Sequence, residues 1–297
     1  MSDQIPILLD TDIGSDIDDA VALAYLLRQP QCQLLGITTV TGDVAKRCAC
    51  AEVVCAAAGR RDIPIHAGRS APLVPGPGQP AVPQYAALEA MPHRRDWPAN
   101  TAVGFLQRTI RAYPGAITLL TIGPLSNVAL LFALDPEIPL LLKQIVSMAG
   151  IFYAAPQDRE WNILVDPVAA TMVYNTPRAP HVSLGLDVTT KCKMAADQVR
   201  QRFTASPLDV VAKMADVWFQ HAHAGEITFH DPLAAAVIFQ PNLCHYEDGT
   251  VQVPLDPDNK SAGKTHFTPG AGNRQPDRVA KTVQVEEFFT EYYKVFA

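Results

Sequence analysis

Five aspartates stand close together near the start of the chain. They are Asp10, Asp12, Asp16, Asp18 and Asp19, five of the 30 acidic residues in the sequence. Carboxylates this close repel one another unless a positive charge neutralises them. A divalent cation supplies that charge, and ligands that are all oxygen favour a hard ion such as calcium or magnesium. The cluster therefore predicts a metal site that takes part in binding or catalysis.

The aspartates lie where a strand is expected to end and a helix to begin. Residues 6–10 form an apolar run that predicts a buried strand, and residues 18–27 have helical periodicity with acids in the first turn. Gly14 allows a sharp turn between the two. Ligands of open α/β sheets bind outside the carboxyl ends of the strands, so the cluster stands where a site is expected.

Other interpretations of the cluster fit less well. Acids that only cap a solvated helix explain the pair at the helix start, but not the earlier aspartates as well. An EF-hand loop starting at Asp10 needs glycine and glutamate where this chain has Ser15 and Val21. A phosphatase of the haloacid-dehalogenase type also begins with two aspartates one residue apart, but usually has Thr or Val in place of Gly14. It is retained as an alternative enzyme.

The composition excludes several classes of protein. The 297 residues are 48% hydrophobic and 18% charged, which suits a folded α/β chain rather than a disordered one. The net charge of −6 argues against a nucleic-acid partner. We see no apolar run long enough for a membrane span or signal peptide, and expect no membrane partner. In a long chain without a visible secretion signal, the six cysteines are expected to be free buried thiols, which predicts a cytoplasmic location. The three that lie together, Cys48, Cys50 and Cys55, lack a usual zinc spacing.

Apolar runs alternate with helical stretches along the chain. The expected strands are residues 6–10, 33–40, 63–66, 116–121, 144–148, 181–186, 250–253 and 279–285. The expected helices are residues 18–27, 44–58, 101–113, 125–134, 167–174, 207–223, 232–239 and 286–296. This alternation predicts one α/β domain over residues 1–297, with a mostly parallel central sheet and helices on both faces. Two segments rich in proline, glycine or polar residues, near 71–100 and 254–276, are expected to be long loops.

Six short motifs resemble the inosine-uridine-preferring nucleoside hydrolases. They are D-T-D-I-G…D-D-A from Asp10, T-I-G-P-L-S-N at 121–127, M-A-G at 148–150, E-W-N…V-D-P at 160–167, G-L-D-V-T at 185–189 and F-H-D-P at 229–232. Each is short, but six in the family's order are specific. The resemblance implies an open-sheet fold, a bound Ca²⁺ ion and hydrolysis of a ribonucleoside to free base and ribose, as in nucleoside salvage. It also implies a homodimer or homotetramer.

The resemblance assigns the metal ligands and the catalytic base. It implies that Asp12 binds the metal and takes the proton of the attacking water. It implies that Asp19, Asp231 and the backbone carbonyl of Ile122 are further metal ligands. Asp10 is expected to support the loop from behind.

The resemblance assigns the substrate contacts as well. It implies that Asp18, Glu160 and Asn162 hold ribose hydroxyls, that Met148 lines the same pocket, and that His230 protonates the leaving base. General chemistry agrees, because cleavage through an oxocarbenium-like state needs a deprotonated water on one face of the sugar. Histidine titrates in the range that suits proton transfer to a base.

Departures from the family pattern leave some assignments open. Three residues, rather than one, separate Gly14 from the aspartate pair, so Asp16 is an alternative to Asp18 as a ribose or metal ligand. Asp43 stands where the family often has asparagine, which makes it a further candidate substrate contact. Candidate base contacts are Trp218, Phe219, His221 and His223, together with the 71–100 loop.

Two alternatives keep the site but change the function. One is the same chemistry on a modified nucleoside or another N-ribosyl compound. The other is a metal-dependent ribose-binding protein without turnover, which the presence of Asp12 disfavours.

Overall fold

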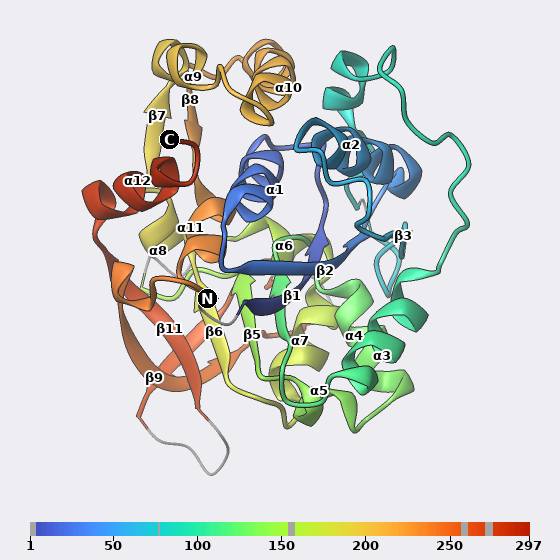
Figure 1. Ribbon diagram of the computed structural model, residues 1–297. Helices are drawn as coiled ribbons and strands as arrows, with labels where there is room; N and C mark the ends of the chain where they lie inside the picture. Colours follow the sequence, from blue (N-terminus) through green and yellow to red (C-terminus); the bar gives the residue numbers. More distant parts are fainter. Residues whose placement is uncertain (1–3, 77, 154–157, 257–260, 271–275) are drawn as a thin grey trace.

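The computed structural model describes residues 4–76, 78–153, 158–256, 261–270 and 276–297. Its main sheet has nine strands in the order β10-β9-β11-β6-β5-β4-β1-β2-β3 (Figure 1). Neighbouring strands are parallel from β3 to β11, and β9 and β10 are antiparallel. The strands are β1 (Ile5–Thr11), β2 (Cys32–Thr39), β3 (Ile65–Ala67), β4 (Thr118–Thr121), β5 (Gln144–Met148), β6 (His181–Leu184), β9 (Cys244–Gln252), β10 (His266–Pro269) and β11 (Asp277–Val283).

Helices cover both faces of this sheet (Figure 1). The longer ones are α1 (Asp18–Arg28), α2 (Val44–Ala57), α3 (Ala102–Ala112), α4 (Ser126–Leu134), α7 (Pro167–Asn175), α10 (Leu208–His221) and α12 (Val285–Lys294). The shorter ones are α5 (Ile138–Leu141), α6 (Trp161–Val165), α8 (Leu186–Thr189), α9 (Ala196–Arg202) and α11 (His230–Ala236). A separate two-stranded antiparallel sheet joins β7 (Lys193–Ala195) to β8 (Glu226–Thr228).

Two hydrophobic cores lie on the two faces of the sheet. Ile7 and Leu9 of β1 belong to the core that contains α1, α2, α11 and α12, whereas Leu8 between them belongs to the core that contains α3, α4 and α7. Successive side chains of a strand point to opposite faces, so a strand covered on both sides must be apolar at every position. This accounts for the continuous apolar run of β1.

The predicted fold class is confirmed: the structure is α/β with a mostly parallel sheet. The loop prediction for 254–276 is wrong in part, because His266–Pro269 form β10 and pair with β9; residues 257–260 and 271–275 lie outside the described residues. The strand expected at 250–253 is the end of the nine-residue β9. The described residues of 71–100, which leave out residue 77, contain one short 3₁₀ helix, Pro83–Ala87, and are otherwise irregular, as predicted.

The six cysteines are all buried and free, as predicted. Burial raises the pKa of several of these thiols, which keeps them protonated. Among the described residues, no helix combines the length and apolar composition needed to cross a bilayer.

Candidate active site

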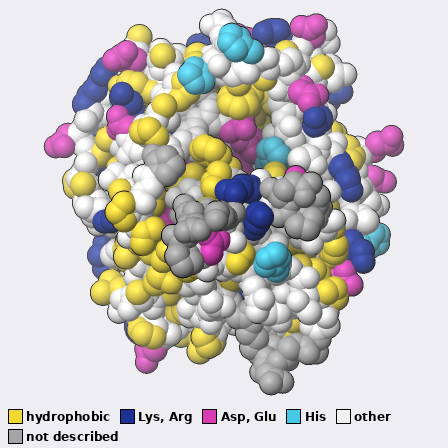
Figure 2. Space-filling view, turned by 180° about the vertical axis from the view of Figure 1, so that it is seen from behind, with side chains coloured by type: hydrophobic (Ala, Val, Ile, Leu, Met, Phe, Trp, Pro, Cys, Tyr) yellow, Lys and Arg dark blue, Asp and Glu magenta, His cyan; other side chains and the backbone are white. Residues whose placement is uncertain are grey.

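A cavity of about 230 Å³ lies beyond the carboxyl ends of the central strands. It is lined by Asp12, Asp16, Asp18, Asp19, Gln79, Ile122, Met148, Arg159, Glu160, Trp161, Asn162, Leu164, Leu186, His230 and Asp231. Figure 2 shows a hollow near the middle of one face of the molecule in which acidic side chains are visible. The catalytic, metal and ribose residues expected from the sequence all line this cavity except Asp43.

The parallel register of three strands brings distant residues to one edge. Asp10 of β1 is level with Thr121 of β4, which is level with Ser147 of β5. Asp12, Ile122 and Met148 therefore meet at the strand ends, although more than a hundred residues separate the first from the other two.

The backbone and side chain of Asp12 lie directly against Gly123. A Cβ atom at that position would lie 2.9 Å from both the backbone nitrogen and Oδ1 of Asp12. Only glycine leaves room for the aspartate there. The glycine of the T-I-G-P motif is thus explained by the approach of the Asp12 side chain.

Three carboxylates form the most compact group in the cavity. One carboxylate oxygen from each of Asp18, Asp19 and Asp231 lies within 4.8 Å of the others, and all three residues are buried. The Asp231 backbone N–H donates to Asp18 Oδ2 at 3.1 Å, and the Thr11 hydroxyl donates to Asp19. Burial and mutual repulsion raise the pKa of each carboxyl well above its usual range. Oxygen ligands this close and this buried fit a hard divalent cation.

The carboxyl groups of Asp12 and Asp16 also have raised pKa values. Burial raises the pKa of Asp12 to about 6, although the nearby Arg47 charge lowers it. Burial also raises the pKa of Asp16 to about 6, and the Asp12 charge adds to that rise. Both carboxyls face the same cavity as the trio, so the geometry leaves both available as ligands.

Arg47 of α2 is completely buried beside this cluster. Its guanidinium donates to uncharged oxygens: the carbonyls of Asp12, Ile13 (3.1 Å), Thr41 (2.7 Å) and Gln79 (3.0 Å) and the hydroxyl of Ser15 (2.8 Å). One side chain thus fixes the aspartate loop, the end of the β2–α2 turn and the 71–100 segment together. Its charge is left to act on the carboxylates through space.

Asp10 lies behind the cavity and is wholly buried. Its Oδ1 accepts from the Thr38 hydroxyl and from Asn127 Nδ2 at 2.8 Å, and Oδ2 has no partner among the described residues. Burial raises its pKa to about 7. Asp10 therefore links β1, β2 and α4 instead of lining the cavity.

Glu160 and Asn162 begin α6 at the cavity wall. Glu160 accepts from the backbone N–H groups of Asn162 (2.7 Å), Ile163 (2.9 Å) and Gly150 (3.1 Å), and burial raises its pKa to about 7. Asn162 Nδ2 donates to the carbonyls of Ile122 (3.1 Å) and Met148 (3.0 Å). These bonds hold the glutamate and the amide in fixed orientations at the strand ends.

His230 begins α11 next to Asp231. Its Nδ1 lies 2.7 Å from the Thr189 hydroxyl. Burial, with a contribution from Lys193, lowers its pKa to about 4, so the ring is neutral at neutral pH. When Nδ1 accepts from Thr189, the proton sits on Nε2 and is available to the cavity.

Several sequence candidates lie elsewhere. Asp43 caps α2 by accepting from the Lys46 backbone N–H at 3.1 Å and does not line the cavity, because the helix start turns its carboxylate away. The candidates on α10 and just after it do not line the cavity either. Phe219 is buried in the core, Trp218 packs against that core, and His221 and His223 are exposed.

The structure also brings to the cavity five residues that the sequence analysis did not name: Gln79, Arg159, Trp161, Leu164 and Leu186. Gln79 belongs to the 71–100 loop, which was expected to contact the base. Trp161 is 51% exposed, and its Nε1 donates to the side-chain oxygen of Gln79. Trp161 could have been predicted from the sequence, because it lies in the E-W-N motif between two residues already assigned to the site.

Arg47→Met tests the dependence of the aspartate loop on the buried guanidinium. We expect the free energy of unfolding to fall by about 3 kcal/mol, because several buried carbonyls lose their donor at once. Urea unfolding followed by circular dichroism measures this. The control is Lys46→Met on the exposed face of the same helix, with an expected change below about 1 kcal/mol. Equal effects of the two substitutions would contradict the account of Arg47.

Known proteins share both the sequence pattern and the fold. The family model described as "Inosine-uridine preferring nucleoside hydrolase" matches residues 7–290. Uridine nucleosidase 1 of Arabidopsis thaliana is 29% identical over 265 residues, 83% of this chain and 77% of that protein. The non-specific ribonucleoside hydrolase RihC of Klebsiella pneumoniae is 32% identical over 251 residues, 81% of each chain.

Solved structures agree in fold. A plant nucleoside hydrolase superposes with a TM-score of 0.84 at 24% identity, covering 99% of both chains. The inosine-uridine preferring nucleoside hydrolase of Bacillus anthracis gives 0.81 at 20% identity, covering 98% of this chain and 99% of that one. The phosphatase alternative is therefore excluded, and the chain belongs to the inosine-uridine preferring nucleoside hydrolase family.

Proposed function

We propose that this chain hydrolyses the N-glycosidic bond of ribonucleosides to a free base and ribose, with the help of a bound calcium ion. The observation that carries the proposal is the sharing of one cavity by Asp12, the carboxylate trio and the Glu160–Asn162 pair. The family membership and the names of the relatives support the same reaction.

The residues proposed to hold the cation are Asp12, Asp19, Asp231 and the carbonyl of Ile122. Asp18 belongs to the same compact group and is close enough to serve both the cation and a ribose hydroxyl. When bound, calcium supplies the missing positive charge and makes a nearby water more acidic. The raised pKa values of the trio support this site, because protons or a cation must otherwise neutralise it.

Asp12 is the proposed base. It takes a proton from water while the water oxygen bonds to C1′ of the ribose, and the C1′–N bond breaks with its electron pair going to the leaving base. Asp18, Glu160 and Asn162 hold the ribose hydroxyls and orient C1′. His230 donates a hydrogen bond from Nε2 to the leaving base, which its neutral ring and Thr189 contact support, and the base takes its proton from solvent as it departs.

The base is proposed to meet Gln79, Arg159 and Trp161 at the mouth of the cavity. Their aromatic and polar groups suit a flat heterocycle. A panel of purine, pyrimidine and modified ribonucleosides, read by liberated reducing sugar, separates ordinary from modified substrates. Binding without any release of sugar would instead support the ribose-binding alternative.

Cellular setting and assembly are part of the proposal. Six free thiols support a reducing, cytoplasmic environment and a role in nucleoside salvage. A homodimer or homotetramer is proposed from the family resemblance, and light scattering measures the assembled mass.

Asp12→Asn tests the base. We expect kcat to fall by about 10³-fold, since the amide cannot take a proton from water but keeps the shape of the side chain. The matched control is Asp43→Asn, which retains the capping of α2 and should stay within about twofold of the parent. Turnover by Asp12→Asn at the parent rate would contradict the assignment.

Stability should respond to pH and calcium together. Folded-state pKa values near 6 for Asp12 and Asp16 and near 7 for Glu160 exceed the unfolded values near 4, so the folded chain holds more protons in between. Without calcium, stability therefore falls as pH rises from about 5 to about 8.

Thermal unfolding in EDTA and in excess calcium measures this effect. We expect a lower Tm at pH 8 than at pH 5 in EDTA, and a larger calcium-induced rise at pH 8, because the carboxylates are then ionised. A Tm in EDTA that rises with pH over this range would contradict the prediction.

A further inference from the structure

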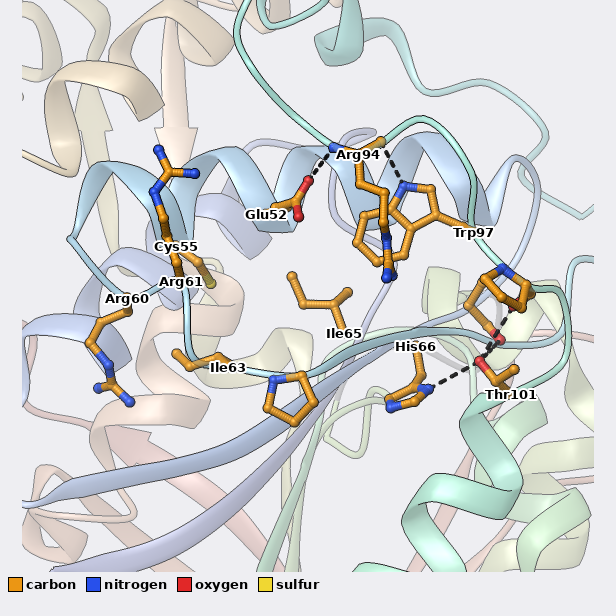
Figure 3. A pocket seen from close by; sticks show the side chains of 13 residues that line it. Glu52, Cys55, Arg60, Arg61, Ile63, Ile65, His66, Arg94, Trp97 and Thr101 are labelled. Atoms are coloured by element: carbon orange, nitrogen blue, oxygen red, sulfur yellow. Dashed lines mark hydrogen bonds between the residues drawn. The ribbon is translucent and has the colours of Figure 1, made fainter.

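A second cavity, of about 350 Å³, lies at the β3 edge of the sheet (Figure 3). It is bounded by α2, by the connection from α2 to β3, and by the segment before α3. It shares no lining residue with the candidate active site. Its size is in the range of small-molecule pockets rather than of a single bound ion.

The lining is electropositive although the chain is acidic. Arg60, Arg61 and Arg94 line the cavity, and Glu52 is the one acid among its lining residues. Asp62 fixes Arg60 through two hydrogen bonds of 2.8 Å. Among the described residues, the guanidinium groups of Arg61 and Arg94 have no carboxylate partner within ion-pairing distance. Two cationic groups at the cavity are thus available to an anion.

One end of the cavity offers a flat stacking surface. The Arg94 guanidinium lies 3.5 Å from the centre of the Trp97 ring, and Trp97 Nε1 donates to the Arg94 carbonyl at 3.0 Å. In Figure 3 Arg94 lies over the indole and extends toward Ile65. A guanidinium stacked on one face keeps its other face for a second flat group.

The two kinds of group stand at opposite ends. Figure 3 shows Arg60 and Arg61 on one side and Arg94 and Trp97 on the other, with Ile63 and Ile65 between them. This order of cations, apolar floor and stacking surface matches a molecule with an anionic head, an uncharged middle and a flat ring. Burial lowers the pKa of His66, and the charges of Arg108 and Arg94 lower it further.

We propose that this cavity is a second small-molecule site that binds a nucleoside monophosphate. The phosphate lies at Arg61, the sugar over Ile63, and the base stacks on Arg94. This site is independent of the hydrolytic cavity and of the reaction proposed there. A carboxylate or inorganic phosphate satisfies the arginines alone and leaves the stacking end unused.

Isothermal titration calorimetry with UMP and AMP tests the proposal. The titrations use the full chain carrying Asp12→Asn, so that heats of turnover do not contribute. We expect binding of one nucleotide that is weakened at least about tenfold by adding either Arg61→Gln or Arg94→Gln. The matched control is Arg202→Gln, which removes another arginine stacked on an aromatic ring, that of Tyr293, and should leave the affinity unchanged.

Other outcomes overturn the proposal. One is an absence of nucleotide binding. Another is equal affinity of the arginine variants and their parent, which places the nucleotide in the other cavity. The third is a loss of affinity in Arg202→Gln as large as that in the arginine variants of the cavity. Inorganic phosphate and uridine are titrated separately and should each bind at least about tenfold more weakly than UMP. If inorganic phosphate or uridine binds with the same affinity as UMP, the site does not contact both the phosphate and the base, and the proposal is contradicted.

Discussion

The repulsion among buried carboxylates is the constraint on which the site depends. Asp12, Asp18, Asp19 and Asp231 are removed from water and placed against one another, which raises the pKa of each. Such an arrangement persists only when positive charge compensates it. Arg47 supplies part of that charge from behind and at the same time fixes the backbone of the aspartate loop. The negative charge that Arg47 does not compensate faces an open cavity, which a cation and a water molecule can enter.

The fold meets this constraint by collecting the ends of several elements at one edge. The carboxyl ends of β1, β4 and β5 bring Asp12, Ile122 and Met148 together at one edge of the sheet. Helix starts supply the rest, since Asp18 begins α1 and Asp231 lies in the first turn of α11. Backbone N–H groups are free of intrahelical partners there, which explains why they donate to Asp18 and to the Glu160 that caps α6.

The sheet could be predicted from the sequence because its strands are continuous apolar runs. Most residues of the candidate site could be predicted because they lie in short motifs. Strand β5 coincides with its predicted range, and the aspartates and the E-W-N motif carry their own chemistry. Short elements such as β7 and β8 were missed, since three residues show no periodicity. Asp43 was placed in the site because its position matched a motif, whereas its carboxylate is used as a helix cap. The 71–100 loop was expected to contact the base, but Gln79 could not be singled out within it, because only the folded segment, fixed through the Gln79 carbonyl by Arg47, brings this residue to the cavity.

The central claim is that one divalent cation binds in this cavity at the carboxylates of Asp12, Asp19 and Asp231. Calorimetric titration of calcium into the EDTA-treated, dialysed protein, repeated in two buffers of different ionisation enthalpy, tests it most directly. The account predicts one calcium ion per chain, proton release on binding because the pKa values of the carboxyls are raised, and loss of binding in Asp231→Asn. An absence of calcium binding, or the same affinity in Asp231→Asn as in the parent, would contradict it.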